Sequence, residues 1–185
     1  MKNLADEQLV KNYLKGDPAA LEFLVQKYLK PMYNFVFKYM HTPEAAEDVT
    51  QEAFLKIWKN IGKFNSKYKF KTWAFTVAKN TALDHLKKKG FVALSSENSE
   101  GTPIEKILAS YEPLPEEAME KLEDAQMVGR AVQRLPEKYS RVLSLYYQNQ
   151  LNFREISQIL KASIHTIKTH HRRALIYLKK ELRDK

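Results

Sequence analysis

Apolar residues recur every three or four positions along most of the chain, which is the period of an amphipathic helix. This pattern predicts a short helix from residue 6 to Gly16, a long one from residue 18 and a third over about 43–61. A fourth helix follows a loop at 62–71, and helical periodicity returns after residue 115. The predicted fold class is therefore all-α.

Local signals mark where these helices begin. Asp6 is predicted to cap the first helix, and an aspartate or threonine directly before a proline marks a helix start at residues 17–18 and 42–43. Pro31 lies inside the long apolar stripe of the second helix, so we expect it to kink that helix without ending it.

Gly90 marks a change of character. Residues 91–115 contain serines, prolines and acidic residues with little periodicity, which predicts a linker with one short helix near 104–110. The sequence therefore predicts two small helical domains, 1–90 and 121–185, joined by an acidic linker at 91–120.

The second domain carries a helix-turn-helix pattern. Asn152 with Glu155 three residues later predicts a capping box at the start of a helix over 153–160. A turn of about three residues leads to a longer basic helix whose inner stripe begins at Ile164. Lys161, at the turn, must adopt a positive φ or use another turn geometry. His171 falls on the inward side, where we expect a neutral, hydrogen-bonded imidazole.

The net charge of +9 is unevenly distributed. Residues 1–90 hold 16 basic and 9 acidic residues, residues 91–125 hold 2 and 9, and residues 126–185 hold 13 and 4. Two basic blocks, at +7 and +9, thus flank an acidic segment at −7. Because basic blocks attract phosphate backbones, a nucleic acid is the expected partner.

Other function classes are excluded by what the chain lacks. It has no cysteine, which excludes disulfides and thiolate zinc sites and fits a reducing compartment. The N-terminus is too charged for a signal peptide, and no apolar run is long enough to cross a bilayer, so we expect a cytoplasmic protein without membrane insertion. No nucleophile–base pair or metal-ligand cluster is recognisable, so we expect no enzymatic activity, no catalytic residue, no metal and no cofactor.

Lysines and aromatic rings alternate through residues 64–89. Rings can stack on bases and lysines can hold phosphates, so this mixture suits a single strand of DNA or RNA. Beyond the loop, Trp73, Asn80 and Asp84 share one helix face that could read base edges. A core helix with a solvated lysine edge is an equally good interpretation from this stretch alone.

The outer face of the third predicted helix is acidic, with Leu55 and Trp58 at its edge. Such a face could dock a basic helix of another protein, although a solvated face explains these residues as well. In the second domain, the outer side of the basic helix can reach major-groove base edges and phosphates. Its histidines at 165, 170 and 171 lack the spacing of a metal site.

Four pieces in this order resemble the ECF (extracytoplasmic-function) sigma factors of bacterial RNA polymerase over nearly the whole length. They are EDVTQEAF at residues 47–54, FKTW through AKN at 70–80, LPEKY at 135–139, and EI to TIKT at 155–169. Each piece alone is weakly specific, but their order and spacing with an acidic linker between them are specific.

The resemblance implies a role for each face. A domain similar to sigma region two would bind the polymerase's largest subunit through Asp48, Gln51, Glu52 and Leu55. It would hold the non-template strand of the minus-ten element with Phe64, Lys69, Phe70, Lys71, Thr72, Trp73, Lys79, Asn80 and Asp84. A domain similar to region four would bind the polymerase flap and read the minus-thirty-five element with His165, Thr166, Lys168, Thr169, Arg172 and Arg173.

The resemblance implies core RNA polymerase, promoter DNA and an anti-sigma factor as partners, the last because the family often pairs with such an inhibitor. The alternative function is a free-standing helix-turn-helix regulator that binds only duplex DNA, with residues 1–90 as a sensor or dimerisation domain. That alternative leaves the aromatic and lysine-rich loop unexplained.

Overall fold

The computed structural model describes residues 4–88, 90, 129, 131–132 and 134–183. Every regular element within these ranges is a helix, which confirms the all-α fold. The predicted linker at 91–120 and its short helix near 104–110 lie outside the described residues.

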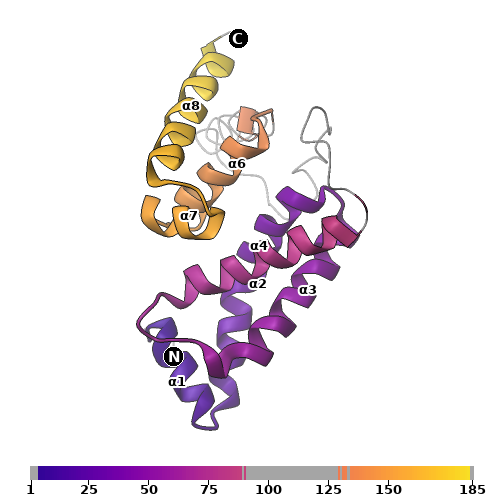
Figure 1. The fold of residues 1–185 in the computed structure, drawn as a ribbon, viewed down its shortest axis with the longest axis vertical. Helices are drawn as coiled ribbons and strands as arrows, with labels where there is room; N and C mark the ends of the chain where they lie inside the picture. The colour runs from indigo at the N-terminus through magenta and orange to yellow at the C-terminus, as the bar shows by residue number, and fades with distance from the viewer. Residues whose placement is uncertain (1–3, 89, 91–128, 130, 133, 184–185) are drawn as a thin grey trace, which may run out of the picture.

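The described helices form two groups (Figure 1). The first group contains α1 (Asp6–Leu14), α2 (Pro18–Met40), α3 (Pro43–Asn60), the short 3-10 helix η1 (Ile61–Lys63) and α4 (Phe70–Lys88). The second contains α6 (Glu137–Leu143), η3 (Ser144–Gln148), α7 (Phe153–Leu160) and α8 (Ile164–Arg183). We refer to the groups as the first and second domain.

The predicted helix starts hold except at α1. Asp17 caps α2 by accepting a hydrogen bond from Ala19 N at 3.1 Å, and α2 continues through Pro31. At α1 the N-cap position is Ala5, and no side chain caps it. The prediction that Asp6 caps α1 is therefore wrong, because this carboxylate instead binds Lys27 Nζ at 2.6 Å and accepts a hydrogen bond from the Tyr28 hydroxyl.

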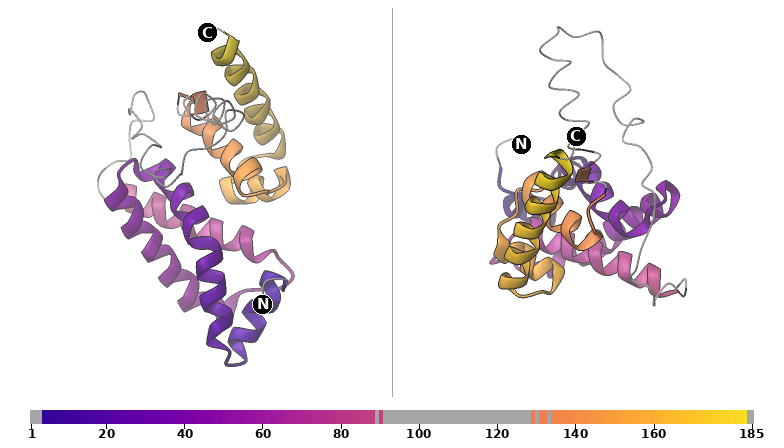
Figure 2. Two further views of the ribbon diagram at one scale, coloured as in Figure 1. Left: turned by 180° about the vertical axis from the view of Figure 1, so that it is seen from behind. Right: turned by 90° about the horizontal axis from the view of Figure 1, so that it is seen from above.

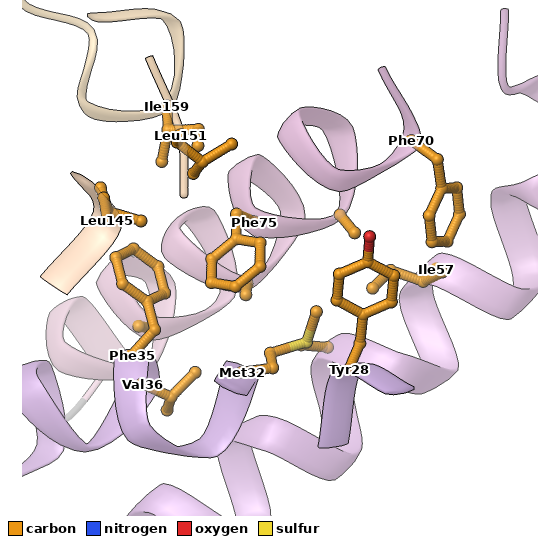
Figure 3. Close-up of a cluster of buried hydrophobic side chains, with 14 of the residues drawn as sticks. Tyr28, Met32, Phe35, Val36, Ile57, Phe70, Phe75, Leu145, Leu151 and Ile159 are labelled. Atoms are coloured by element: carbon orange, nitrogen blue, oxygen red, sulfur yellow. The ribbon is translucent and has the colours of Figure 1, made fainter. Parts of the chain in front are cut away.

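The first domain is built on a core of large side chains. Met32 and Phe35 of α2 pack with Phe75 of α4, and all three are fully buried (Figure 3). Ala46, Val49, Ala53 and Ile57 supply the inward stripe of α3. Burial of one such large side chain contributes about 1.5–3 kcal/mol, so this core fixes α2, α3 and α4 against one another.

The helix that begins at Glu137 changes its winding after Leu143. Residues Ser144–Gln148 form a π-helical turn. Asn149 stabilises this turn because both its backbone N, at 3.0 Å, and its side-chain amide, at 3.1 Å, donate to Ser144 O. Asn149 is buried at 3% exposure, so the wider turn satisfies its polar groups where a regular helix would not.

The two domains pack against each other. Leu145, Leu151 and Ile159 of the second domain lie beside Phe35 and Phe75 in one continuous apolar cluster (Figure 3). The second domain covers α2 and α4, while α8 extends away from the first domain (Figures 1 and 2). The arrangement of the domains could not be predicted from sequence, because periodicity does not say which apolar stripes pair.

Candidate nucleic-acid interface

The loop before α4 is shaped by Asn65. The Asn65 side chain accepts a hydrogen bond from Lys67 N at 3.0 Å, and its carbonyl accepts one from Tyr68 N at 3.0 Å. This compact turn leaves Tyr68 64% exposed between exposed Lys67 and Lys69. We call residues 64–69 the aromatic loop. Its exposed ring beside cations has the composition of a surface on which an unstacked base can lie.

Three rings join the aromatic loop to α4. The centroid of the Phe64 ring lies 5.6 Å from that of Phe70 and 5.3 Å from that of Trp73, and the Phe70 and Trp73 rings are 5.7 Å apart. Phe70 is only 3% exposed, whereas Phe64 and Trp73 are half-buried. We call these three residues the ring cluster. Phe70 supports the other two rings from beneath and does not offer a free face to a base.

The predicted strand-binding residues on α4 differ in accessibility. Trp73 and Asn80 are half-buried, and Asp84 is exposed. Thr72 and Lys79 are each only 7% exposed. Two further predicted residues belong to the aromatic loop, where Phe64 is half-buried and Lys69 is exposed. Lys71, in the first turn of α4, is half-buried. The structure thus brings Trp73, Asn80 and Asp84 onto one accessible face and leaves Thr72 and Lys79 covered.

Lys79 is covered by the second domain. Burial lowers its pKa most, and the cationic groups of Lys161 and Arg141 lower it further. Near the start of α4, burial also lowers the pKa of Lys71, while the carboxylate of Asp6 opposes this effect. Two of the predicted phosphate-binding lysines therefore lie in low-dielectric surroundings in the packed arrangement.

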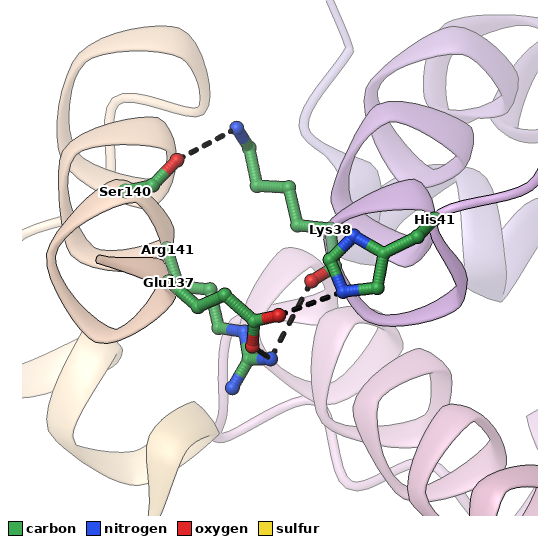
Figure 4. Close-up of polar contacts among 5 residues, drawn as sticks. All are labelled: Lys38, His41, Glu137, Ser140 and Arg141. Atoms are coloured by element: carbon green, nitrogen blue, oxygen red, sulfur yellow. Dashed lines mark hydrogen bonds and ion pairs between the residues drawn. The ribbon is translucent and has the colours of Figure 1, made fainter. Parts of the chain in front are cut away.

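Polar contacts join the two domains between the end of α2 and α6 (Figure 4). Glu137 of α6 binds His41 Nε2 at 2.7 Å and also pairs with Arg141. The Lys38 ammonium donates to Ser140 Oγ at 3.1 Å, and Arg141 Nη2 donates to the Lys38 carbonyl at 3.4 Å. Burial and the cation of Arg141 lower the pKa of Lys38, and the hydrogen bond from His41 lowers that of Glu137.

The helix-turn-helix unit of the second domain has the predicted capping box, but Ile164, predicted to begin the inner stripe of α8, is 39% exposed. Asn152 accepts hydrogen bonds from the backbone of Arg154 and Glu155, and Glu155 accepts one from Asn152 N at 2.8 Å, which completes the predicted capping box. Lys161 has φ 53° and ψ 44°, so of the two predicted alternatives it adopts the positive φ. Ser163 Oγ then accepts a hydrogen bond from Thr166 N at 3.0 Å at the start of α8.

The predicted reading residues all lie on α8. His165, Lys168, Arg172 and Arg173 are exposed, and Thr166 and Thr169 are half-buried. Exposed cations on one accessible helix are the chemistry that major-groove and phosphate contacts need.

His171 faces inward, as predicted, but its environment differs from the prediction. The ring centroids of Tyr146, Tyr147 and Phe153 lie 4.8, 5.7 and 5.2 Å from that of His171. Burial lowers the pKa of His171, which favours the neutral ring. The expected hydrogen bond is not made at Nε2, which is buried without a partner among the described residues.

A second surface on the first domain borders an apolar groove. On α3, Asp48 and Gln51 are exposed, and Glu52 pairs with Lys56 Nζ at 2.8 Å, a hydrogen bond that lowers the pKa of Glu52. The groove beside them has a volume of about 450 Å³ and runs between α2 and α3. We call Asp48, Gln51, Glu52 and Leu55 the acidic face.

Sequence reasoning missed parts of these surfaces. Leu29, at 51% exposure, lines the groove beside Leu55, at 51%, and Trp58, at 50%, the two residues that the sequence does place at the edge of this face. The place of Leu29 in this groove could not be predicted, because the sequence does not show that α2 packs beside this face of α3. Tyr68 lies in the stretch where rings and lysines alternate, and this alternation is the sequence signal that identifies it as a candidate base-stacking residue.

The described residues contain neither a metal-binding cluster nor a helix that could cross a membrane. No three His, Asp or Glu side chains within them gather as they would around a metal ion. No helix in the described ranges combines the length and apolar character that crossing a membrane requires.

Comparisons with known proteins match both domains. The family profile Sigma-70 region 2 matches residues 24–92, and Sigma-70, region 4 matches residues 125–178. The ECF RNA polymerase sigma factor SigW of Bacillus subtilis is 32% identical over 178 residues, which are 95% of each chain. The ECF RNA polymerase sigma-E factor of Escherichia coli K12 is 29% identical over 94% of this chain and 92% of its own length.

Solved structures share the fold. CnrH in complex with the cytosolic domain of CnrY matches with a TM-score of 0.64 at 16% identity, over 98% of this chain and 99% of CnrH. The sigma factor RpoE of Bartonella quintana, in complex with the anti-sigma factor NepR, also matches with a TM-score of 0.64, at 21% identity over 88% of this chain and 96% of RpoE. With two sigma-70 regions in order and an ECF sigma factor that is 32% identical over 95% of both chains, the chain belongs to the ECF RNA polymerase sigma factors.

Proposed function

We propose that this sigma factor binds core RNA polymerase through the acidic face, anchors promoter duplex with α8 and captures the opened non-template strand with α4 and the aromatic loop. Residues 1–90 and 121–185 are the proposed working units, with residues 91–120 as the connection between them. The polymerase performs the chemistry, so this chain contributes binding and is not itself an enzyme. A protein that acts on promoter DNA with the polymerase is expected in the cytoplasm.

The observation that carries strand capture is the accessible face of α4. Trp73 offers a half-exposed ring, and Asn80 and Asp84 follow at helical steps with an amide and a carboxylate that discriminate donors from acceptors on bases. Stacking of one base on a protein ring contributes about 1–3 kcal/mol. Opening a base pair costs a few kcal/mol, so capture of a few bases offsets most of that cost.

An anti-sigma partner is part of the proposal. The relatives CnrH and Bartonella quintana RpoE share this fold and are bound to the cytosolic domain of CnrY and to the anti-sigma factor NepR. We therefore expect this chain to have a protein inhibitor.

The free-standing regulator remains the competing function. A regulator that binds only duplex DNA needs α8 but has no use for exposed Tyr68 among lysines or for the face with Trp73. The full-length relatives named above are RNA polymerase sigma factors. These two observations favour the sigma function.

Transcription with purified components tests the proposal. Core polymerase without its own sigma factor is mixed with this protein and a promoter library, and run-off transcripts are sequenced. Specific transcripts support the proposal. Tight duplex binding by the protein alone, with no transcript, would establish the free-standing regulator instead.

Strand capture has a finer test. Trp73→Ala and Asn80→Ala should impair promoter opening, measured by permanganate reactivity of unpaired thymines, more than binding of closed duplex. Asn12→Ala is the matched control, because Asn12 is also half-buried but lies on α1. An equal loss of opening and of duplex binding in the α4 variants would mean that these residues are only structural.

Docking of the polymerase has its own matched pair. Leu55→Ala, at 51% exposure beside the groove, should weaken affinity for core polymerase about tenfold, because roughly 1–2 kcal/mol of apolar burial is lost. Leu14→Ala, at 52% exposure on α1, should leave the affinity unchanged. Equal effects of the two substitutions would remove the acidic face from the proposal.

A further inference from the structure

The first turn of α4 is capped by a side chain of α1, which is 63 residues away in the sequence. Glu7 of α1 accepts a hydrogen bond from the backbone N–H of Phe70, with 2.8 Å between Oε1 and N. Phe70 begins α4, and Lys69 stands directly before it. A lysine side chain has no hydrogen-bond acceptor, so position 69 cannot supply the side-chain cap that helix starts usually have. Glu7 instead supplies an acceptor for the Phe70 N–H, one of the four N–H groups that the start of a helix leaves without an intrahelical partner.

The charges around this helix end explain why an acidic cap matters. Lys67, Lys69 and Lys71 gather near the start of α4, where the positive end of the helix dipole disfavours cations. The carboxylate of Glu7 lies at that end and opposes their repulsion. The same lysines are the ones that a phosphate backbone needs, so the cap allows the sequence to keep them there.

A second contact fixes α1 where Glu7 can reach. Asp6 binds Lys27 Nζ at 2.6 Å and accepts a hydrogen bond from the Tyr28 hydroxyl. The centroid of the Tyr28 ring lies 5.8 Å from that of Phe70. Adjacent carboxylates of α1 therefore hold α2 and the start of α4 together from one side.

We infer that Glu7 is a positioning residue for strand capture. It contacts no base in this scheme: it fixes the amide of Phe70, and Phe70 supports the half-buried rings of Phe64 and Trp73 in the ring cluster. A fixed ring cluster loses less conformational freedom when a strand binds, which strengthens binding without any new contact. This inference rests on the proposed strand capture by α4.

Two glutamate variants and a control test the inference in the full-length protein. Glu7→Ala removes the acceptor, and Glu7→Gln keeps an oxygen that can accept from the Phe70 N–H. Glu22→Ala is the control, because Glu22 is an exposed glutamate of α2 whose side chain accepts a hydrogen bond from the side chain of Gln26 on the same helix. Thermal unfolding of each variant establishes that it is folded at the assay temperature.

The first readout does not depend on function. Hydrogen exchange of the Phe70 amide, measured by NMR, should be about tenfold faster in Glu7→Ala, because its acceptor is lost. Glu7→Gln should recover most of the protection, and Glu22→Ala should leave it unchanged. An unchanged exchange rate in Glu7→Ala would show that the cap does not form in solution and would overturn the inference.

The second readout compares two promoter probes bound by the reconstituted holoenzyme. One probe is fully duplex, and the other is forked with a single-stranded minus-ten element. Glu7→Ala should weaken binding of the forked probe roughly five- to tenfold while duplex binding changes less than twofold, with substantial rescue by Glu7→Gln. Equal binding of the forked probe by Glu7→Ala and the unchanged protein, despite faster exchange at Phe70, would overturn the inference.

Trp73→Ala in the same assay separates the two proposals. If Trp73→Ala weakens forked-probe binding and Glu7→Ala does not, strand capture stands and the positioning role of Glu7 fails. If Trp73→Ala has no effect, the proposed strand capture fails and the inference for Glu7 fails with it. If Glu7→Ala does not fold, the comparison of Glu7→Gln with a shorter carboxylate in Glu7→Asp decides: the inference requires Glu7→Asp to be the weaker strand binder.

Discussion

The guanidinium of Arg141 in the second domain lies over the ring of Tyr39 in the first, with Cζ 3.9 Å from the ring centroid. The same side chain donates to the carbonyl of Lys38 at 3.4 Å and pairs with Glu137. A cation against an aromatic face, partly shielded from water, is more favourable than the same pair in solvent. Burial meanwhile raises the pKa of Tyr39 to about 12, so its phenol stays neutral at physiological pH.

This pair should contribute measurably to the packing of the two domains. In a double-mutant cycle with Arg141→Met and Tyr39→Leu, we expect a coupling free energy of about 0.5–2 kcal/mol, from urea unfolding of the four proteins. The control is the same cycle with Arg134→Met in place of Arg141→Met. Arg134 pairs with Glu181 at 3.3 Å within the second domain, so its coupling to Tyr39 should be near zero. A coupling energy near zero between Arg141 and Tyr39 would mean that this contact contributes nothing to the packing of the two domains.

The inward histidine of α8 should make the second domain sensitive to acid. Nε2 of His171 is buried among aromatic rings without a hydrogen-bond partner in the described residues. His171→Leu should therefore raise the free energy of unfolding by about 1 kcal/mol at pH 7, since no polar atom is left unsatisfied. His165→Gln, an exposed change on the same helix, should have no effect.

The direction of the pH effect follows from the lowered pKa of His171. Below about pH 6.5 the unfolded chain takes up a proton that the folded, buried ring does not, so the unfolded state is favoured. The free energy of unfolding therefore has its full value above the unfolded pKa of His171. It decreases as the pH falls from that pKa through the lower folded pKa. Urea midpoints between pH 7.5 and 5 should fall more steeply for the unchanged protein than for His171→Leu, and parallel curves would contradict this.

Features set by neighbouring residues could be predicted from the sequence. The capping box of Asn152 and Glu155 depends on interactions within a few residues, and the structure has it. The inward stripes of α2 and α3 follow from periodicity alone. These are contacts for which spacing along the chain fixes spacing in space.

Features that join distant segments could not be predicted. Glu7 and Phe70 are 63 residues apart, and no local signal links them. Lys79 has the sequence signature of an exposed phosphate ligand, but the second domain buries it to 7% exposure. Both features depend on which helices pack together, and the periodicity of the sequence does not show this.

The strained turn of the helix-turn-helix unit offers a stabilising substitution. A left-handed conformation costs a non-glycine residue about 1–2 kcal/mol, part of which glycine loses again through its freer unfolded state. Lys161→Gly should therefore stabilise the protein by about 0.5–1 kcal/mol in urea unfolding. Lys161→Met separates charge from strain, because it removes the ammonium near Lys79 and keeps the left-handed backbone. If Met stabilises as much as Gly, repulsion between lysines and not backbone strain is the cause.

Lys79 should show opposite effects on stability and on function. In the packed arrangement it is 7% exposed, and burial, Lys161 and Arg141 all lower its pKa. Lys79→Met should raise the free energy of unfolding by about 1 kcal/mol at pH 7, because no cation is then held in apolar surroundings.

The same substitution should weaken binding of the forked promoter by the holoenzyme about three- to tenfold if the second domain moves off Lys79 in that complex, because one phosphate contact is then lost. The unchanged protein should approach the stability of the variant as the pH rises toward the unfolded lysine pKa of about 10.4, since the folded state gives up its proton first. Urea unfolding at pH 7 and pH 9.5 measures this convergence. A variant that loses both stability and strand binding would show that Lys79 holds the domain interface together, and a variant that keeps full strand binding would show that the second domain still covers Lys79 in the working complex.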